Sequence, residues 1–103
     1  MAEQLHREIF EKLKKSVPKM HWRCWASEES GATLITASFV ANQFDGTKEE
    51  YTAAHLSISK QGDDRWHYSA GFMQSVDQFS THETAIPWLL SKFRQFAVEE
   101  TES

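Results

Sequence analysis

Apolar and polar residues alternate along four consecutive stretches in the middle of this chain, and a period of two is typical of β-strands with one buried face. Sequences rich in turn-forming residues separate the stretches, among them SEESGA at 27–32 and the Asp45-Gly46 pair. We therefore predict four short strands that pair in chain order as an antiparallel meander. The stretches are HWRCW at 21–25, TLITASFVAN at 33–42, YTAAHLSISK at 51–60 and RWHYSAGFM at 65–73.

An amphipathic helix is predicted on each side of these strands. In residues 3–17 apolar side chains recur at every fourth position, and Pro18 ends the pattern. In the C-terminal segment Thr84 is the predicted N-cap, which places Pro87 in the first helical turn; a cap at Ser80 would place it deeper. The two apolar stripes are Leu5, Ile9, Phe10, Leu13 and Val17, and Ile86, Leu89, Leu90, Phe93, Phe96 and Ala97.

The order of these elements predicts an α+β protein, α-β-β-β-β-α, in which a four-stranded antiparallel meander carries two amphipathic helices on one face. A chain of 103 residues has room for one domain with a modest core. We expect residues 1–103 to form that single domain, with residues 98–103 as a frayed tail.

The hairpin between the third and fourth strands has one register that puts the apolar residues of both strands on one face. Pairing Lys60 with Asp64 places Ile58 opposite Trp66, whereas pairing Lys60 with Arg65 puts the two apolar sets on opposite faces. A slip of one residue inverts every side chain, so burial favours the first register. We therefore predict that Trp66 is buried, together with Tyr68 and Phe72.

The segment HWRCW brings a histidine, an arginine, the single cysteine and two tryptophans together. Its alternation predicts Trp22 and Cys24 on the buried face, with Cys24 as a small buried hydrophobic residue, and His21, Arg23 and Trp25 on the other. His21 and Cys24 are too few ligands for a zinc site, and the chain has no phosphate-binding loop or nucleophile motif. We expect no metal, no cofactor and no enzymatic activity.

Carboxylates are concentrated in two of the predicted turns. The net charge is −4, and residues 1–25 alone carry six Lys or Arg against three Asp or Glu, so the excess of negative charge lies in residues 26–103. Alternate turns of a meander fall at one end of the sheet, which predicts an acidic patch that a basic partner would recognise. The exposed tryptophans expected to aid it, Trp25 and Trp88, fall off the predicted core faces. The four carboxylates are those of Glu28, Glu29, Asp63 and Asp64.

A second candidate surface is the polar face of the third and fourth strands. In the predicted register His55 and His67 are diagonal neighbours, within about 7 Å of each other. Two histidines beside an arginine and a tyrosine have the chemistry to bind a phosphate or to act as acid and base, although antiparallel sheets commonly present one solvated polar face. The residues of this face are Tyr51, His55, Arg65 and His67.

These features favour a non-enzymatic protein-binding module, such as a bacterial or phage inhibitor, immunity protein or adaptor. One alternative is a nucleic-acid-binding domain that uses the basic first helix and HWRCW, although the negative net charge argues against nucleic acid as a partner. Another is a small enzyme working through His55 and His67. A single cysteine, a charged N-terminal segment and the lack of a long apolar run predict a cytoplasmic protein without membrane spans. The partner's identity and the oligomeric state stay open.

Overall fold

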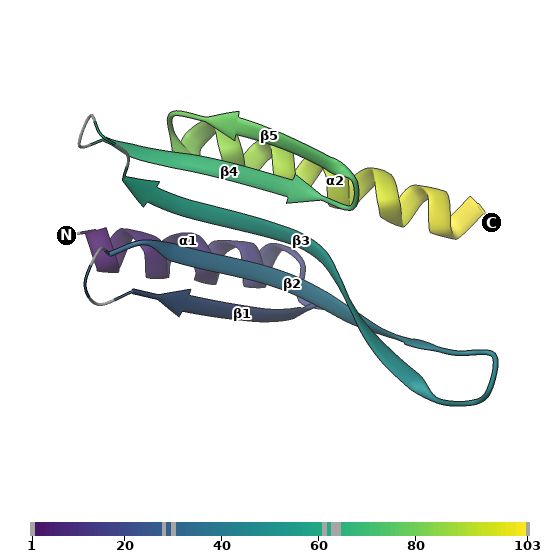
Figure 1. Cartoon of the computed structure of the whole chain (residues 1–103). Helices are drawn as coiled ribbons and strands as arrows, with labels where there is room; N and C mark the ends of the chain where they lie inside the picture. Colours follow the sequence, from purple (N-terminus) through teal and green to yellow (C-terminus); the bar gives the residue numbers. More distant parts are fainter. Residues whose placement is uncertain (1, 28, 30, 61, 63–64, 103) are drawn as a thin grey trace.

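The computed structural model describes residues 2–27, 29, 31–60, 62 and 65–102, and only the backbone of residues 2–3 and 96–102. It is an α+β fold, as predicted, with a five-stranded antiparallel sheet in the order β1-β2-β3-β4-β5 and both helices on one face (Figure 1). We call the other face the open face. The elements are α1 (Ala2–Ser16), β1 (His21–Ala26), β2 (Thr33–Asn42), β3 (Lys48–Lys60), β4 (Trp66–Phe72), β5 (Ser75–Phe79) and α2 (His82–Glu102).

The sheet has one strand more than predicted. The additional strand, β5, pairs with β4 and forms an edge of the sheet, with Phe79 opposite Tyr68. Only Phe79 of β5 packs against the core, and the other four residues are exposed. An edge strand with a single inward apolar residue carries too little alternation to be identified from sequence.

The core lies between the helices and the sheet. Tyr68 and Phe72 are buried as predicted, and the Phe72 ring meets that of Phe93 edge-on with centroids 4.9 Å apart. Trp66 is only half-buried, because it lies at the end of the sheet, where its ring contacts His6 of α1 at 4.7 Å between centroids. The largest fully buried side chains are Leu13, Ile35, Leu56, Ile58 and Leu89.

The predicted register of the β3–β4 hairpin is wrong by two residues. Lys60 pairs with Trp66, and Ile58 pairs with Tyr68, so residues 61–65 connect the strands. A shift of two residues keeps every side chain on its face, and the choice of face was therefore right although the pairing was not.

An irregularity in the β2–β3 pairing changes which face a residue of β3 occupies. Ala37 pairs with Ala54, but the next residue, Ser38, pairs with Thr52, so β3 has one extra residue, a β-bulge. Alternation restarts at the bulge. As a result Tyr51 lies on the helix side of the sheet beside Phe39, and not on the face that carries His55, as the sequence had predicted.

The second helix begins earlier and extends further than predicted. It starts at His82, preceded by Thr81, whose carbonyl accepts hydrogen bonds from the Thr84 hydroxyl (3.0 Å) and the Ala85 amide (3.2 Å). Pro87 therefore lies inside the helix. The helix continues through Glu102, into the segment expected to fray. Within the described ranges, neither helix combines the length and apolar character needed to cross a membrane.

Candidate functional site

The acidic patch was predicted at the end of the sheet that carries the β1–β2 and β3–β4 connections (Figure 1). Glu28, Asp63 and Asp64 lie outside the described residues, and Glu29 is exposed. The observed register also brings positive charge to this end. Arg65 falls within the β3–β4 connection, and the Lys60 ammonium lies 5.0 Å above the Trp66 ring. The described residues at this end therefore carry both signs of charge.

The two tryptophans proposed as anchors differ in their accessibility. Trp25 is 52% exposed on the open face, where it pairs with Leu34, itself 40% exposed. Trp88 was expected to be exposed, but it is half-buried at the margin of the core: its ring lies 5.7 Å from that of Phe79, and the Lys92 ammonium covers it at 5.3 Å. Trp25 is thus the more accessible of the two predicted anchors.

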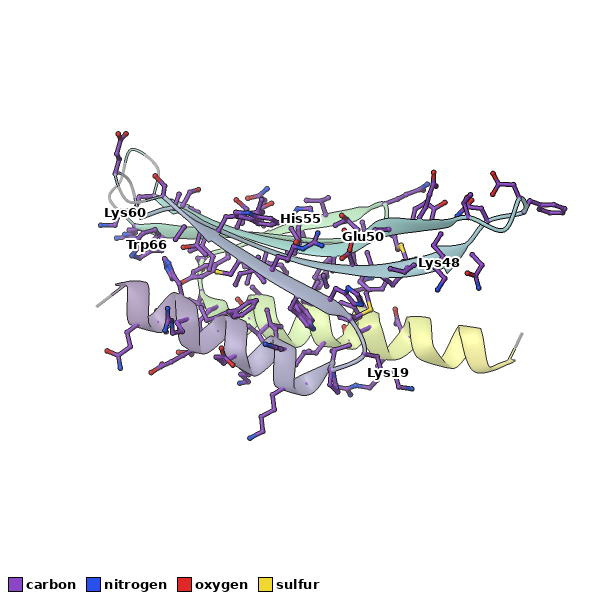
Figure 2. All side chains as sticks on the ribbon, turned by 90° about the horizontal axis from the view of Figure 1, so that it is seen from below. Lys19, Lys48, Glu50, His55, Lys60 and Trp66 are labelled. Atoms are coloured by element: carbon purple, nitrogen blue, oxygen red, sulfur yellow. The ribbon has the colours of Figure 1, made fainter. Side chains whose placement is uncertain are left out.

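The histidines of the polar face are not neighbours. His55 pairs with Gly71 and His67 with Ser59, so four residues of β4, about 13 Å, separate the two positions. Figure 2 shows His55 on the side of the sheet away from the helices. The predicted His55/His67 pair is wrong, since it depended on the incorrect register, and Arg65 lies before the start of β4.

Tyr51 is held by polar neighbours of its own strand and turn. Its hydroxyl donates a hydrogen bond to the Glu49 carboxylate (2.8 Å) and accepts one from the side-chain amide of Gln43 (2.8 Å). The bond to Glu49 is the main reason why the pKa of Tyr51 is raised. Tyr51 therefore contributes to the β2–β3 hairpin and not to a site with the histidines.

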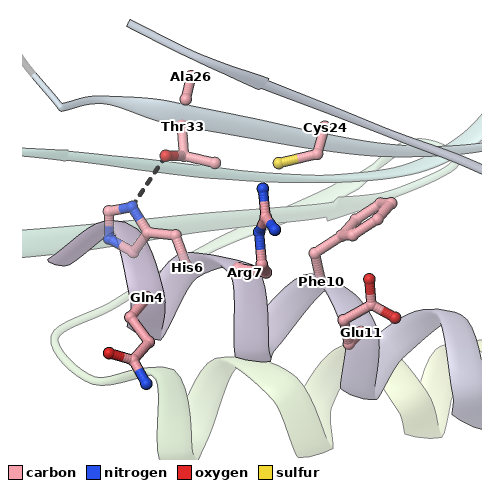
Figure 3. A pocket seen from close by; sticks show the side chains of 8 residues that line it. All are labelled: Gln4, His6, Arg7, Phe10, Glu11, Cys24, Ala26 and Thr33. Carbon is pink, nitrogen blue, oxygen red and sulfur yellow. Dashed lines mark hydrogen bonds between the residues drawn. The ribbon is translucent and has the colours of Figure 1, made fainter. Parts of the chain in front are cut away.

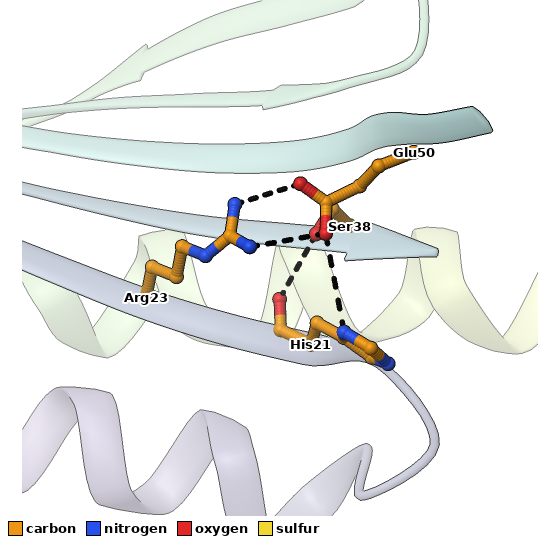
Figure 4. Close-up of polar contacts among 4 residues, drawn as sticks. All are labelled: His21, Arg23, Ser38 and Glu50. Atoms are coloured by element: carbon orange, nitrogen blue, oxygen red, sulfur yellow. Dashed lines mark hydrogen bonds and ion pairs between the residues drawn. The ribbon is translucent and has the colours of Figure 1, made fainter. Parts of the chain in front are cut away.

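A polar network on the open face occupies Arg23 (Figure 4). Its guanidinium donates two hydrogen bonds to the Glu50 carboxylate, at 2.7 and 3.1 Å, and His21 Nδ1 lies 3.9 Å from the same carboxylate. Hydrogen bonding from Arg23 is the largest cause of the lowered pKa of Glu50. The basic helix α1 covers the opposite face of the sheet. The predicted nucleic-acid surface is thus divided between two sides of the molecule.

The hairpin at residues 40–50, which we call the arm, extends past the other strands, on the side of the molecule to which the C-terminal half of α2 also runs (Figure 1). Phe44 is fully exposed at its tip. Hydrogen bonds close the turn: the Gln43 backbone amide donates to the Thr47 carbonyl (2.7 Å), and both the backbone amide and the hydroxyl of Thr47 donate to the Asp45 carboxylate (3.0 and 2.6 Å). These bonds, that of the hydroxyl above all, lower the pKa of Asp45.

Phe44 was not among the functional candidates predicted from the sequence. The available signal was a phenylalanine next to an Asp-Gly turn, where no neighbouring strand residue can cover it. Gly46 adopts a φ of 87°, which glycine accommodates without strain, so the turn residues hold Phe44 outward at little conformational cost.

A groove of about 750 Å³ runs between α1 and β1 (Figure 3). The Arg7 side chain points from α1 towards Cys24 of β1. Cys24 was predicted to be buried, but it is exposed. Partial burial raises the pKa of the Cys24 thiol, and the positive charge of Arg7 opposes this effect. The groove is lined by Gln4, His6, Arg7, Phe10, Glu11, Cys24, Ala26 and Thr33.

In the part of the chain that the structure describes, no three His, Cys, Asp or Glu side chains lie close enough to hold a metal ion. Comparison with family models, curated proteins and solved structures finds no match to this chain.

Proposed function

We propose that this protein is a non-enzymatic, cytoplasmic protein-binding module of the inhibitor, immunity or adaptor type. The observation that carries the proposal is the full exposure of Phe44 at the tip of the arm. Large aromatic side chains are typical anchors of protein interfaces. Because hydrogen bonds within the turn already order its backbone, presenting Phe44 to a partner costs little conformational entropy.

Charge on the arm supports a partner with a basic surface. Within the arm the carboxylates of Asp45 and Glu49 outnumber the one cation, Lys48, and the Glu50 carboxylate is paired with Arg23 of β1. At the other end of the sheet, Glu29 adds negative charge to the connection that follows β1, the strand of Trp25. The sequence also has Glu28 in that connection and Asp63 and Asp64 between β3 and β4. Complementary charge accelerates association more than it strengthens the final complex, whereas a desolvated aromatic mainly slows dissociation.

Trp25 is the second contact in this proposal. With Leu34 it forms an exposed apolar pair on the open face. A solvated sheet face needs no tryptophan for folding, because its residues do not contact the core. Phe44 and Trp25 would therefore engage two parts of one large partner or two different partners.

The test captures partners from the source cell with wild-type protein and measures the association and dissociation rates of each purified partner. Phe44→Ala and Trp25→Ala are the variants, and Val76→Ala, an exposed apolar truncation on β5, is the matched control. At least one of the two variants should speed dissociation by about 30-fold, which corresponds to roughly 2 kcal/mol. The control should bind as the wild type does.

Reversal of charge at Asp63 and Asp64 should slow association and flatten its dependence on salt, with little effect on dissociation. Normal binding by the Phe44 and Trp25 variants, together with loss of binding on His55→Ala or Arg65→Ala, would assign the working surface to the polar face and contradict the proposal. An enzymatic turnover that His55→Ala abolishes would contradict it as well.

A further inference from the structure

The strand β1 is an uncovered edge of the sheet. It pairs with β2 on one side, and within the described ranges no strand or loop donates or accepts a backbone hydrogen bond on its other side. Five of its six residues are exposed. Every second residue of an edge strand directs its N–H and C=O outward, and such edges pair readily with another extended chain. Arg23 is the only charged residue of β1, and it is neutralised by Glu50.

The α1–β1 groove lies beside this edge on the helix side of the sheet (Figure 3). Cys24 and Ala26, which alternate along β1, form its sheet wall and are small enough to leave the groove open. Phe10 supplies an apolar surface from α1. The volume of the groove, about 750 Å³, is within the range of ligand-binding sites. A strand added to β1 would direct alternate side chains into this space.

Arg7 provides the groove with an available cation. It makes no hydrogen bond or ion pair within the part of the chain that the structure describes, although Glu11 lies one turn further along the helix. The guanidinium is instead directed across the groove to Cys24 (Figure 3). A guanidinium in this position is suited to a carboxylate, which it can bind through two parallel hydrogen bonds. The His6–Thr33 hydrogen bond of 2.8 Å fixes the neighbouring wall.

We propose that an extended peptide segment of a partner protein, carrying an Asp or Glu side chain, pairs with β1 as a sixth strand of the sheet. Its backbone bonds to the outer edge of β1, alternate side chains fill the α1–β1 groove, and its carboxylate binds Arg7. This is peptide recognition by strand addition, in which the backbone provides affinity and the groove provides specificity. The site is separate from the arm and does not depend on the function proposed for it.

A peptide fits this edge better than a second copy of the chain. If β1 of one copy paired with β1 of another, the helix-side residues of each β1 would have to enter the α1–β1 groove of the other copy. Trp22 cannot do so, because its indole N–H is bonded to the Val17 carbonyl (2.7 Å) and its ring lies 5.8 Å from Phe93 in its own core. A peptide has no such prior contacts.

The test uses ten-residue peptides selected from a random display library on the full chain, with the tightest binder synthesised as a fluorescent probe. The binder should contain an acidic residue, and its replacement by the amide should weaken binding by about tenfold or more. Arg7→Gln should have the same effect, and Lys12→Gln, on α1 but outside the groove, should have little. Methylation of the probe's backbone nitrogens should abolish binding at alternate positions only, the pattern of a paired strand. Bound probe should slow alkylation of Cys24.

Phe44→Ala protein should bind the probe as the wild type does, so failure of the arm and failure of this site are distinguished. Selection of no peptide, equal binding by Arg7→Gln protein, or tolerance of methylation at every position would overturn the proposal. A concentration-dependent dimer that excludes the probe would assign the edge to a second copy and would overturn it too.

Discussion

The imidazole ring of His55 on β3 covers Gly71, its paired residue on β4. A Cβ atom added at Gly71 would overlap the ring, with Nδ1 only 2.7 Å and Nε2 only 2.8 Å away. The φ of Gly71 is not in the positive region, so the backbone itself would accept alanine. The glycine is thus required by the ring of a neighbouring side chain and not by backbone conformation.

The effect of Gly71→Ala should therefore reverse with the residue at position 55. In the wild type the new methyl group displaces the His55 ring and should destabilise the fold by about 1 kcal/mol. In a His55→Ala background the same change should stabilise it by roughly 0.5–1 kcal/mol, because alanine restricts the unfolded chain more than glycine does. Urea unfolding of the four proteins in this cycle measures both effects. Equal effects in the two backgrounds would contradict the observed contact.

Two leucines of neighbouring strands should differ greatly in their contribution to stability. Leu56 is fully buried on the helix side, and Leu56→Ala should lower the free energy of unfolding by about 2–5 kcal/mol. Leu34 is 40% exposed on the open face, and Leu34→Ala should cost less than about 1 kcal/mol. Denaturant titration of each variant tests this difference. Similar losses for both would mean that the helices do not cover the face assigned to Leu56.

Burial of His6 should make the fold sensitive to mild acid. The side chain is 3% exposed, and this burial lowers the pKa of His6 below its ordinary value of about 6.5. The unfolded chain therefore binds the proton more tightly. The contribution of uncharged His6 to the free energy of unfolding is therefore complete when the pH is above the ordinary pKa of histidine. It is lost as the pH falls from that value towards the lower pKa of the folded state. Unfolding measured at pH 7.5 and 5.5 should show a decrease.

The control for that measurement is His6→Gln, which cannot titrate. It should be less stable than the wild type at the higher pH, because the Thr33 contact is altered, but its stability should change less between the two conditions. An identical decrease in both proteins would assign the acid sensitivity to another group.

Nucleic acid should not bind with an affinity that depends steeply on salt. Arg23 is paired with Glu50, and the helix α1, which carries most of the basic residues near the N-terminus, covers the other face of the sheet. The described residues therefore form no concentrated basic face with exposed aromatics. Gel retardation with duplex DNA or RNA at micromolar protein and near-physiological salt should give no shifted band. A band that weakens steeply as salt rises would restore the nucleic-acid hypothesis.

Local patterns in the sequence were sufficient to assign most faces. The alternation through HWRCW and RWHYSAGFM correctly separated Trp22 from Trp25 and placed Tyr68 inward, because successive strand residues point to opposite sides. The stripe through Leu5, Ile9 and Leu13 likewise identified the first helix. Each of these predictions rests on the spacing of apolar residues within a single helix or strand.

The candidate sites depended on distances between elements, which periodicity does not contain. A register that differs by two residues leaves the same side chains inward, so burial alone could not exclude it. The predicted proximity of His55 and His67 depended on the wrong one of these two registers. The bulge at Ala37 and Ser38 moved Tyr51 to the other face through one unpaired residue.

Apolar patterning by itself determined that this chain forms a helix, a meander and a second helix, and which sides of these elements are buried, since both follow from the spacing of residues a few positions apart. Tertiary packing decided the register of the β3–β4 hairpin, the fifth strand, the reach of the arm beyond the other strands and the approach of Arg7 to Cys24. These features depend on how one element lies against another, and the energies of such contacts enter only when the elements meet.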